Sequence, residues 1–371
     1  MRQRQRTIEL HAVLSQLTQR AVPGLSITVI QGERVLTEDA VGVADIARRR
    51  RATHSTVYLW FSMTKIVTAT AAMQLVEDGR LRLDDPVAHY LPEFPSPRKG
   101  WPPIHVKHLL SHSSGLVNPI PVRWVHPADE PARDPHRFTL ELLHRYSKLR
   151  FPAGTKASYT NLGYIALGQV LTVAAGQQYE DYVRENILRP LGMIRTDFVY
   201  RPDMSGDAAT GYQSRLSPLT PVLRALLPGG IVAGNQGRFL AFRPFCVDGA
   251  AYGGLIGPVG DAARFVTAHL NQGQLNDTRL LSAESVQRMQ TITARGRKLD
   301  VGLGWFRRHA DRTSDGQYLE HLGGGGGFFS MMRIYPERQL GVVVMGNATN
   351  YDHQQVADAA VRYADLCQPS A

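Results

Sequence analysis

The N-terminal part of the chain shows first a helical and then a strand-like hydrophobic pattern. Residues 7–20 carry apolar side chains three or four positions apart, which predicts an amphipathic helix at the surface. Residues 24–31 and 34–40 are rich in strand-forming residues and are separated by a Gly-Glu pair, which predicts an antiparallel hairpin. A sheet is therefore expected to begin near the N-terminus.

A second helical stretch, over residues 62–78, is apolar nearly all round. It is followed by Gly79, and glycine commonly terminates a helix. Because a helix without a polar face is normally buried, this one is predicted to lie in the interior.

The middle of the chain has a different character. Prolines are dense over residues 84–103, and helical patterns dominate beyond them. Residues 208–249 fit neither pattern and are expected to be irregular, in part as a lid. The helices predicted in the middle of the chain are residues 104–111, 139–147, 162–175 and 179–188.

Strand patterns return toward the C-terminus. The predicted elements are helices over residues 261–272, 282–291 and 352–363 and strands over 328–335 and 339–346. Strands at both ends with helices between them indicate an α+β fold, an antiparallel sheet flanked by helices with an inserted all-helical domain. We place the sheet domain in residues 1–83 and 250–371 and the mainly helical domain in residues 84–249.

The composition excludes several classes of protein. The chain has 371 residues, of which 43% are hydrophobic, so it can bury a large core. Its two cysteines, Cys246 and Cys367, are too few for a disulfide scaffold and suit a reduced compartment. Neither a signal-peptide pattern nor a run of 18 apolar residues is present. We therefore expect a soluble, cytoplasmic protein with no membrane partner.

The net charge of +10 raises the question of nucleic-acid binding, which depends on where the charge lies. Seven of the arginines stand in two places, with Arg2, Arg4 and Arg6 near the start and one run from Arg48 to Arg51. The run lies between two strand-like segments and is interpreted as a solvated connection rather than a phosphate-binding patch. No zinc-finger, RRM or helix-turn-helix motif accompanies it, so no nucleic-acid partner is expected.

The interior helix opens with a serine and a lysine one turn apart. Ser62 and Lys65 are three positions apart, which puts the hydroxyl and the amine on the same face. Burial and the positive end of the helix dipole both lower the pKa of such a lysine, so Lys65 could accept a proton from Ser62. The alternative is that Ser62 is only a helix N-cap and that Lys65 reaches the surface.

The same spacing occurs a second time, at Ser96 and Lys99. This copy stands among prolines, which prevent the helical turn that would bring the two side chains together. Only the first copy has the structural context that the chemistry needs.

A tyrosine and an asparagine precede the helix predicted from residue 162. Tyr159 and Asn161 are two positions apart, and in an extended segment such side chains project to the same side. The phenol could relay protons, and the amide could orient a substrate carbonyl. Alternatively, Asn161 is a helix N-cap and Tyr159 is an ordinary half-buried aromatic residue.

Five consecutive glycines, Gly323 to Gly327, follow shortly after His321. Packing alone gives little reason for five glycines in a row. On a strand beside a cleft, glycines let a substrate approach the backbone, and the amide of Gly324 could donate to an oxyanion. The alternative is a flexible turn with His321 at the surface, whereas a phosphate-binding loop would require the missing G-K-[ST] sequence.

Two other kinds of site are not supported by the sequence. His105, His108 and His112 have helical spacing, but they lack the glutamate of a zinc motif and a turn follows at once. No G-x-S-x-G sequence is present, which argues against an α/β-hydrolase. We expect no metal and no cofactor.

Taken in this order, the three motifs resemble those of the serine β-lactamase and penicillin-binding-protein superfamily. The similarity is greatest to its class C branch, with the related esterases and peptidases. The motifs are Ser62-x-x-Lys65, Tyr159-x-Asn161 and His321-x-Gly323, and four further stretches also match, namely residues 108–116, 151–164, 252–257 and 302–305. The resemblance implies an antiparallel sheet covered by helices and a helical domain, with the active site between them.

The resemblance also implies a role for each motif residue. Ser62 would be the acylated nucleophile, Lys65 its base and Tyr159 a second proton relay. The backbone N–H groups of Ser62 and Gly324 would form the oxyanion hole. Substrate binding would fall to Asn161, His321, Gly323 and Gly324, and Asn161 would also contact the lysine.

The chain departs from the lactamase branch at the third motif, where His321 replaces the lysine of K-T-G. A histidine is often neutral at pH 7 and attracts a β-lactam carboxylate less strongly than a lysine does. We therefore expect a serine hydrolase whose partner is a small ester or amide, with carboxylic esters as the leading substrate class. The alternatives are a D-amino-acid peptidase or amidase, a weak β-lactamase, an acyltransferase and, outside catalysis, a ligand-binding sensor.

Overall fold

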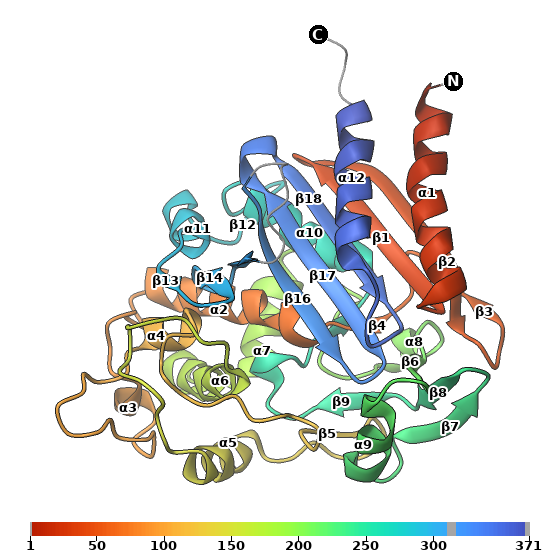
Figure 1. The fold of residues 1–371 in the computed structure, drawn as a ribbon. Coiled ribbons are helices and arrows are strands. Elements are labelled where there is room, and N and C mark those ends of the chain that lie inside the picture. The colour runs from red at the N-terminus through yellow and green to blue at the C-terminus, as the bar shows by residue number, and fades with distance from the viewer. Residues whose placement is uncertain (1, 310–316, 368–371) are drawn as a thin grey trace.

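The computed structural model describes residues 2–309 and 317–367, and of the side chains those from Glu9 onward. The side chains of Arg2, Arg4 and Arg6 thus lie outside the described part. At its centre is a nine-stranded antiparallel sheet with the order β13-β14-β15-β16-β17-β18-β1-β2-β3 (Figure 1). The strands are β1 (Gly24–Gln31), β2 (Arg34–Asp45), β3 (Arg50–Arg51), β13 (Ala294–Arg295), β14 (Leu299–Val301), β15 (Phe306–Arg308), β16 (Leu319–Gly325), β17 (Phe328–Tyr335) and β18 (Leu340–Gly346). The predicted α+β fold class with an antiparallel sheet is confirmed.

The two ends of the chain meet in the middle of this sheet. Strand β18 pairs with β1, so that Gly346 lies opposite Leu25. Strand β1 then turns back into β2, with Gln31 opposite Arg34, which confirms the predicted hairpin. Pairing between strands so far apart in sequence cannot be read from local patterns, and it makes the sheet discontinuous along the chain.

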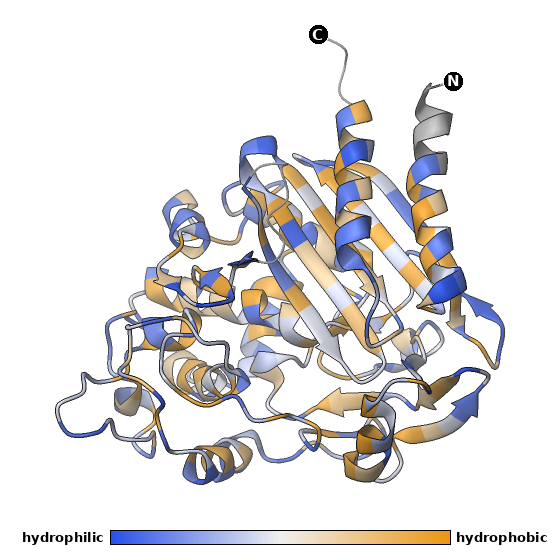
Figure 2. Ribbon diagram, in the orientation of Figure 1, coloured by the Kyte–Doolittle hydropathy of each residue, from blue (hydrophilic) through white to orange (hydrophobic). Residues whose placement is uncertain are grey.

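Both faces of the central strands are covered by helices. Val342 and Val344 of β18 belong to a core under α1 (Arg2–Arg20) and α12 (His353–Cys367), which lie side by side (Figure 1). Val343 of the same strand belongs to the core on the opposite face, where α10 (Val259–Leu270) packs. Successive side chains of a strand point to opposite faces, so a strand buried on both sides is apolar throughout. Figure 2 shows this apolar character along the strands and polar residues along α1 and α12.

The predicted interior helix is confirmed, with a different start. A short 3₁₀ turn, η1 (Phe61–Met63), precedes α2 (Thr64–Glu77), and the residues from Thr64 to Met73 are all buried. Ser62 therefore lies in the tight turn, and Lys65 lies in the first turn of the α-helix.

The prediction that residues 208–249 are irregular is wrong. This segment forms a small sheet, β6-β8-β7, with α9 beside it. Its strands have four or five residues, and two of the three contain a glycine, so they are too short to show an alternating pattern. Contacts with distant segments hold these strands in place. The N–H of Tyr212 donates to the carbonyl of Gly327, and the carbonyl of Tyr212 accepts from the N–H of Thr349.

The remaining elements surround the main sheet and the interior helix. Between residues 84 and 249 they are α3 (Val87–Tyr90), α4 (Val106–Leu110), β5 (Val125–Pro127), α5 (Pro135–Arg145), α6 (Asn161–Ala175), α7 (Tyr179–Val183), η2 (Arg184–Leu188), α8 (Pro202–Ser205), β6 (Gly211–Ser214), α9 (Leu219–Leu226), β7 (Val232–Gln236), β8 (Phe239–Phe242) and β9 (Phe245–Val247). Outside it they are β4 (Tyr58–Leu59), η3 (Ala250–Tyr252), β10 (Ile256–Gly257), β11 (Gln274–Leu275), β12 (Thr278–Arg279), α11 (Ala283–Gln290) and η5 (Pro336–Arg338). The domain boundaries at residues 84 and 249 stay a prediction.

The arginine run forms the tip of a hairpin between β2 and β3. Arg48 and Arg49 lie in the turn, and Arg50 donates a hydrogen bond to the carbonyl of Ala208.

Within the described residues, no helix combines the length and the apolar character that crossing a membrane requires.

Candidate active site

Four segments distant in sequence meet around Ser62 and Lys65. They are the turn η1 with the start of α2, the residues that lead into α6, the turn η3, and strand β16. Lys65 binds groups from two other segments, namely Asn161 of α6 and Tyr252 of η3. Ser62 is partly exposed, whereas Lys65 has no exposed surface.

Ser62 and Lys65 are in direct contact. The Nζ atom of Lys65 lies 2.9 Å from the Oγ atom of Ser62. Lys65 is fully buried, so the interpretation that it reaches the surface is wrong. Neither η1 nor α2 has a side-chain N-cap hydrogen bond, so Ser62 is not placed there as a cap. Helical geometry is what brings the two groups together.

The surroundings of Lys65 favour the neutral amine. Its Nζ lies 2.9 Å from Oδ1 of Asn161 and 2.6 Å from the carbonyl oxygen of Tyr252. Burial lowers the pKa of Lys65 well below its usual value. A neutral amine has two N–H donors and one lone pair, and two acceptors other than Ser62 are present. The lone pair is therefore left to face the hydroxyl of Ser62.

Tyr159 lies beside the same pair of groups. The Nζ atom of Lys65 is 5.1 Å from the centre of the phenol ring. Burial raises the pKa of the Tyr159 phenol, and the neighbouring Ser62 hydroxyl opposes this shift. The phenol thus keeps its proton at neutral pH, and in this form it can pass a proton on while it accepts another.

Asn161 faces the lysine because its neighbour caps the helix. The side chain of Thr160 accepts a hydrogen bond from Gly163 at the start of α6, so the interpretation of Asn161 as the N-cap is wrong. The backbone N–H of Asn161 is held by Oδ1 of Asn118 at 2.9 Å. Both contacts fix the direction of the amide toward Lys65.

The glycine run has a packing role after all, and this corrects the sequence interpretation. A Cβ atom on Gly323 would lie 1.9 Å from the carbonyl oxygen of Trp60, and one on Gly325 would lie 2.3 Å from the ring of Phe61. Glycine at these two positions therefore lets β16 lie against η1. The strand spans Leu319–Gly325, so His321 to Gly325 belong to the sheet and not to a flexible turn.

We expect Gly323→Ala to disturb the site, because the new methyl group would collide with the backbone of Trp60. Overpacking of this kind costs about 1–3 kcal/mol and would shift β16 relative to Ser62. Thermal unfolding and the reactivity of Ser62 toward an acylating reagent should both show the loss. Gly326→Ala is the matched control, because a Cβ there meets nothing within 4 Å. Equal effects of the two variants would contradict this account.

Strand β16 has an open edge beside η1. Strand β15 pairs with β16 through Phe306 and Glu320 alone, whereas β17 pairs with β16 over its whole length. Along the open edge, every second residue directs its N–H and C=O away from β17. Ser62 stands at the second position of its helical turn, where the N–H has no intrahelical acceptor. We therefore expect the backbone N–H groups of Ser62 and Gly324 to be available as hydrogen-bond donors to an oxyanion.

His321 lies inside the protein and not at its surface. It has no exposed surface, and its ring centre is 4.6 Å from that of Phe306 and 6.1 Å from that of Tyr159. Burial lowers the pKa of His321 well below its usual value, and a proton on Lys65 would lower it further, while a hydrogen bond to the Leu322 carbonyl opposes the shift. The ring is neutral. Its part in substrate binding stays a prediction.

Sequence analysis missed three contributors to this site. They are the Tyr252 carbonyl, the Asn118 amide and His112, whose ring centre lies 4.3 Å from that of Tyr159. The spacing of His112 from His105 and His108 suggests only a metal ligand, and a carbonyl group carries no signal in a sequence. Within residues 2–309 and 317–367, no three His, Cys, Asp or Glu side chains gather as metal ligands would.

Comparison with known proteins assigns the chain to a family. The family model described as Beta-lactamase matches residues 10–366. The chain belongs to the beta-lactamase family. The D-alanyl-D-alanine-carboxypeptidase/endopeptidase AmpH of Escherichia coli (strain K12) is 25% identical over 301 residues, which cover 76% of this chain and 69% of AmpH. The protein is thus a serine hydrolase of the β-lactamase and penicillin-binding-protein superfamily.

Solved structures of the superfamily share the fold of this family member. The octameric penicillin-binding protein homologue from Pyrococcus abyssi superimposes with a TM-score of 0.79 at 26% identity, over 96% of this chain and 77% of the homologue. The D-amino acid amidase from Ochrobactrum anthropi SV3 also has a TM-score of 0.79, at 21% identity, over 97% of this chain and 99% of the amidase. At that identity, the second likeness shows the fold alone.

Proposed function

We propose that this protein hydrolyses small carboxylic esters through an acyl-enzyme on Ser62. The observation that carries the proposal is the contact of 2.9 Å between the serine hydroxyl and a fully buried lysine amine. A buried neutral amine is a base that can activate a neighbouring hydroxyl.

In the first half of the reaction, Ser62 attacks the ester carbonyl carbon while its proton moves to Nζ of Lys65. The carbonyl oxygen becomes an oxyanion, which the N–H groups of Ser62 and Gly324 would stabilise. When the C–O bond breaks, the leaving alkoxide takes a proton through the phenol of Tyr159, which Lys65 in turn reprotonates. The products are an alcohol and an ester on Ser62.

In the second half, water attacks the acyl-enzyme. Lys65 and Tyr159 remove one proton from the water, the new oxyanion binds the same N–H groups, and the proton returns to Oγ of Ser62 as the acid leaves. Asn161 holds the amine in place through both halves by its contact of 2.9 Å.

The choice of esters follows from charge. Neither Lys65 nor His321 supplies a positive charge, because burial favours the neutral form of both side chains. A substrate with a free carboxylate would therefore find no counter-charge at these two positions, whereas an uncharged ester needs none. Esters also have better leaving groups than amides.

A second candidate function is the hydrolysis of D-amino-acid amides or peptides. It is favoured by the match to a D-alanyl-D-alanine carboxypeptidase/endopeptidase over 76% of this chain. The same serine, lysine and tyrosine would serve either reaction, so the acyl donor distinguishes the two.

The test compares acyl donors by turnover and by intact protein mass. We expect p-nitrophenyl butyrate to have a kcat/KM at least about tenfold above D-phenylalanine amide and nitrocefin. A fluorophosphonate should add one mass increment, located on Ser62. Faster turnover of the amide would replace the ester proposal with the second candidate. No adduct with any compound would favour the non-catalytic sensor.

A further inference from the structure

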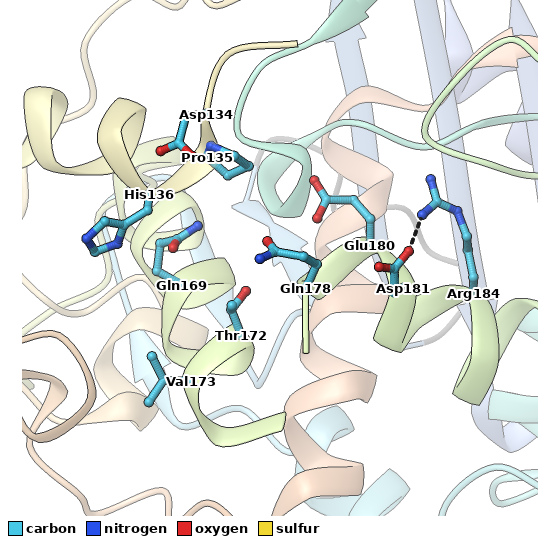
Figure 3. Close-up of a pocket in the computed structure, with 10 residues that line it drawn as sticks. All are labelled: Asp134, Pro135, His136, Gln169, Thr172, Val173, Gln178, Glu180, Asp181 and Arg184. Atoms are coloured by element: carbon cyan, nitrogen blue, oxygen red, sulfur yellow. Dashed lines mark hydrogen bonds and ion pairs between the residues drawn. The ribbon is translucent and has the colours of Figure 1, made fainter. Parts of the chain in front are cut away.

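A groove in the part of the molecule between residues 134 and 184 shares no residue with the candidate active site. Its volume is about 570 Å³, within the range of small-molecule sites. Its walls are the start of α5, the middle of α6, and α7 with η2 (Figure 3). The lining residues are Asp134, Pro135, His136, Gln169, Thr172, Val173, Gln178, Glu180, Asp181 and Arg184.

Glu180 is a partly buried carboxylate in this groove without an ion-pair partner among the described residues. Arg184, whose charge acts on Glu180, forms ion pairs with Asp181 at 2.7 Å and with Asp197 at 2.9 Å. Burial raises the pKa of Glu180, and a hydrogen bond from its own backbone N–H and the charge of Arg184 oppose the rise. A desolvated carboxylate of this kind is stabilised by a cation that brings its own N–H donors.

The other acidic groups of the groove are already occupied. The carboxylate of Asp134 accepts a hydrogen bond from the N–H of Arg137 and so caps α5, at 2.7 Å. Asp181 is paired with Arg184. Glu180 is therefore the acidic side chain that remains for a ligand.

Gln169 is a second, independent sign of a missing partner. It is only 8% exposed, and in the part of the chain that the structure describes its amide makes no hydrogen bond. In Figure 3 the amides of Gln169 and Gln178 and the carboxylate of Glu180 face the same space below Pro135. Its N and O atoms are not enclosed by the protein, so the amide is open to the groove and available to a ligand.

We propose that this groove binds a small organic cation with N–H donors, an alkylammonium or alkylguanidinium compound. Its charged end would pair with Glu180, and the oxygens of Gln169 and Gln178 would accept its remaining N–H groups. Val173, which is 56% exposed at the groove, would contact the alkyl part. Anionic compounds are disfavoured by the same carboxylate.

Titration calorimetry of the full chain with agmatine tests this site. We expect saturable binding with a Kd on the order of 1 mM, which weakens as salt is added. 1,4-Butanediol, an uncharged compound of similar length, should show no saturable heat. Glu180→Gln should weaken agmatine binding by about tenfold or more, because it removes the charge and keeps the shape.

Two further variants separate binding from stability. Glu185→Gln makes the same change on an exposed side chain outside the groove and should leave agmatine binding within about twofold. Gln169→Leu should weaken binding with little change in the melting temperature, since the Gln169 amide makes no hydrogen bond among the described residues. Three outcomes would overturn the proposal. They are the absence of saturable agmatine binding to the wild type, agmatine binding by Glu180→Gln as tight as that by the wild type, and diol binding by the wild type as tight as its agmatine binding. These readouts do not depend on the activity of Ser62.

Discussion

Ser62→Ala is expected to lower kcat/KM for p-nitrophenyl butyrate by about 10⁴-fold or more. The variant keeps the pocket and the oxyanion donors, but it has no atom that can form the acyl-enzyme. Because Ser62 is partly exposed and caps no helix, its loss should change the melting temperature little. The fluorophosphonate mass increment should disappear together with turnover.

The chain contains its own control for this experiment. Ser96 and Lys99 repeat the S-x-x-K spacing, but residues 94–98 form no helix. Ser96→Ala should therefore retain the activity and the adduct of the wild type. Turnover in Ser62→Ala at the wild-type level, or its loss in Ser96→Ala, would refute the assignment of the nucleophile.

Lys65→Met is expected to lower kcat/KM by about 10³-fold, because the hydroxyl of Ser62 loses its base. Its effect on folding should be much smaller. Methionine fills a similar volume and removes the cost of burying an amine, but it leaves Oδ1 of Asn161 and the Tyr252 carbonyl without their donor, so the two contributions to the free energy of unfolding oppose each other. Activity assays and urea unfolding together measure the two effects. Lys99→Met, at the second copy of the motif, should change neither.

The pH dependence provides a sharper readout for Lys65. In the folded protein its pKa is lowered by burial, whereas in the unfolded chain it returns to about 10.4. Between these two values the unfolded state binds the additional proton, so the stability of the wild type should rise with pH across this window. Below the folded pKa both the stability and kcat/KM should be lowest, because the amine is charged. Lys65→Met should lack this rise in stability, and an equal rise in both proteins would contradict a buried neutral amine.

Secondary structure was predictable where apolar residues form one face of an element or fill the whole of a buried element. The hairpin of β1 and β2 and the interior helix α2 follow from hydrophobic periodicity, which is a local property. The small sheet of β6, β7 and β8 was not predictable, because strands of four or five residues gain their stability from neighbours far away in sequence.

The candidate site shows the same division. The S-x-x-K spacing predicts a contact between hydroxyl and amine because helical geometry alone brings positions three apart together. The packing role of Gly323 could not be predicted, because its close approach to Trp60 comes from the packing of β16 on η1. His112, Asn118 and the carbonyl of Tyr252 went unnoticed, since contacts made through backbone groups or ring faces leave no spacing rule in a sequence.

By itself, the order of residues determined the helices, the hairpin and the pairing of Ser62 with Lys65. These depend on neighbours within one or two turns of the chain. Only the tertiary structure decided that His321 is enclosed and that, among the residues described, the Lys65 amine is buried without a counter-charge and Glu180 faces a groove without an ion-pair partner. Burial and charge compensation depend on which distant segments pack around a group, and this is what turns an ordinary lysine into a base.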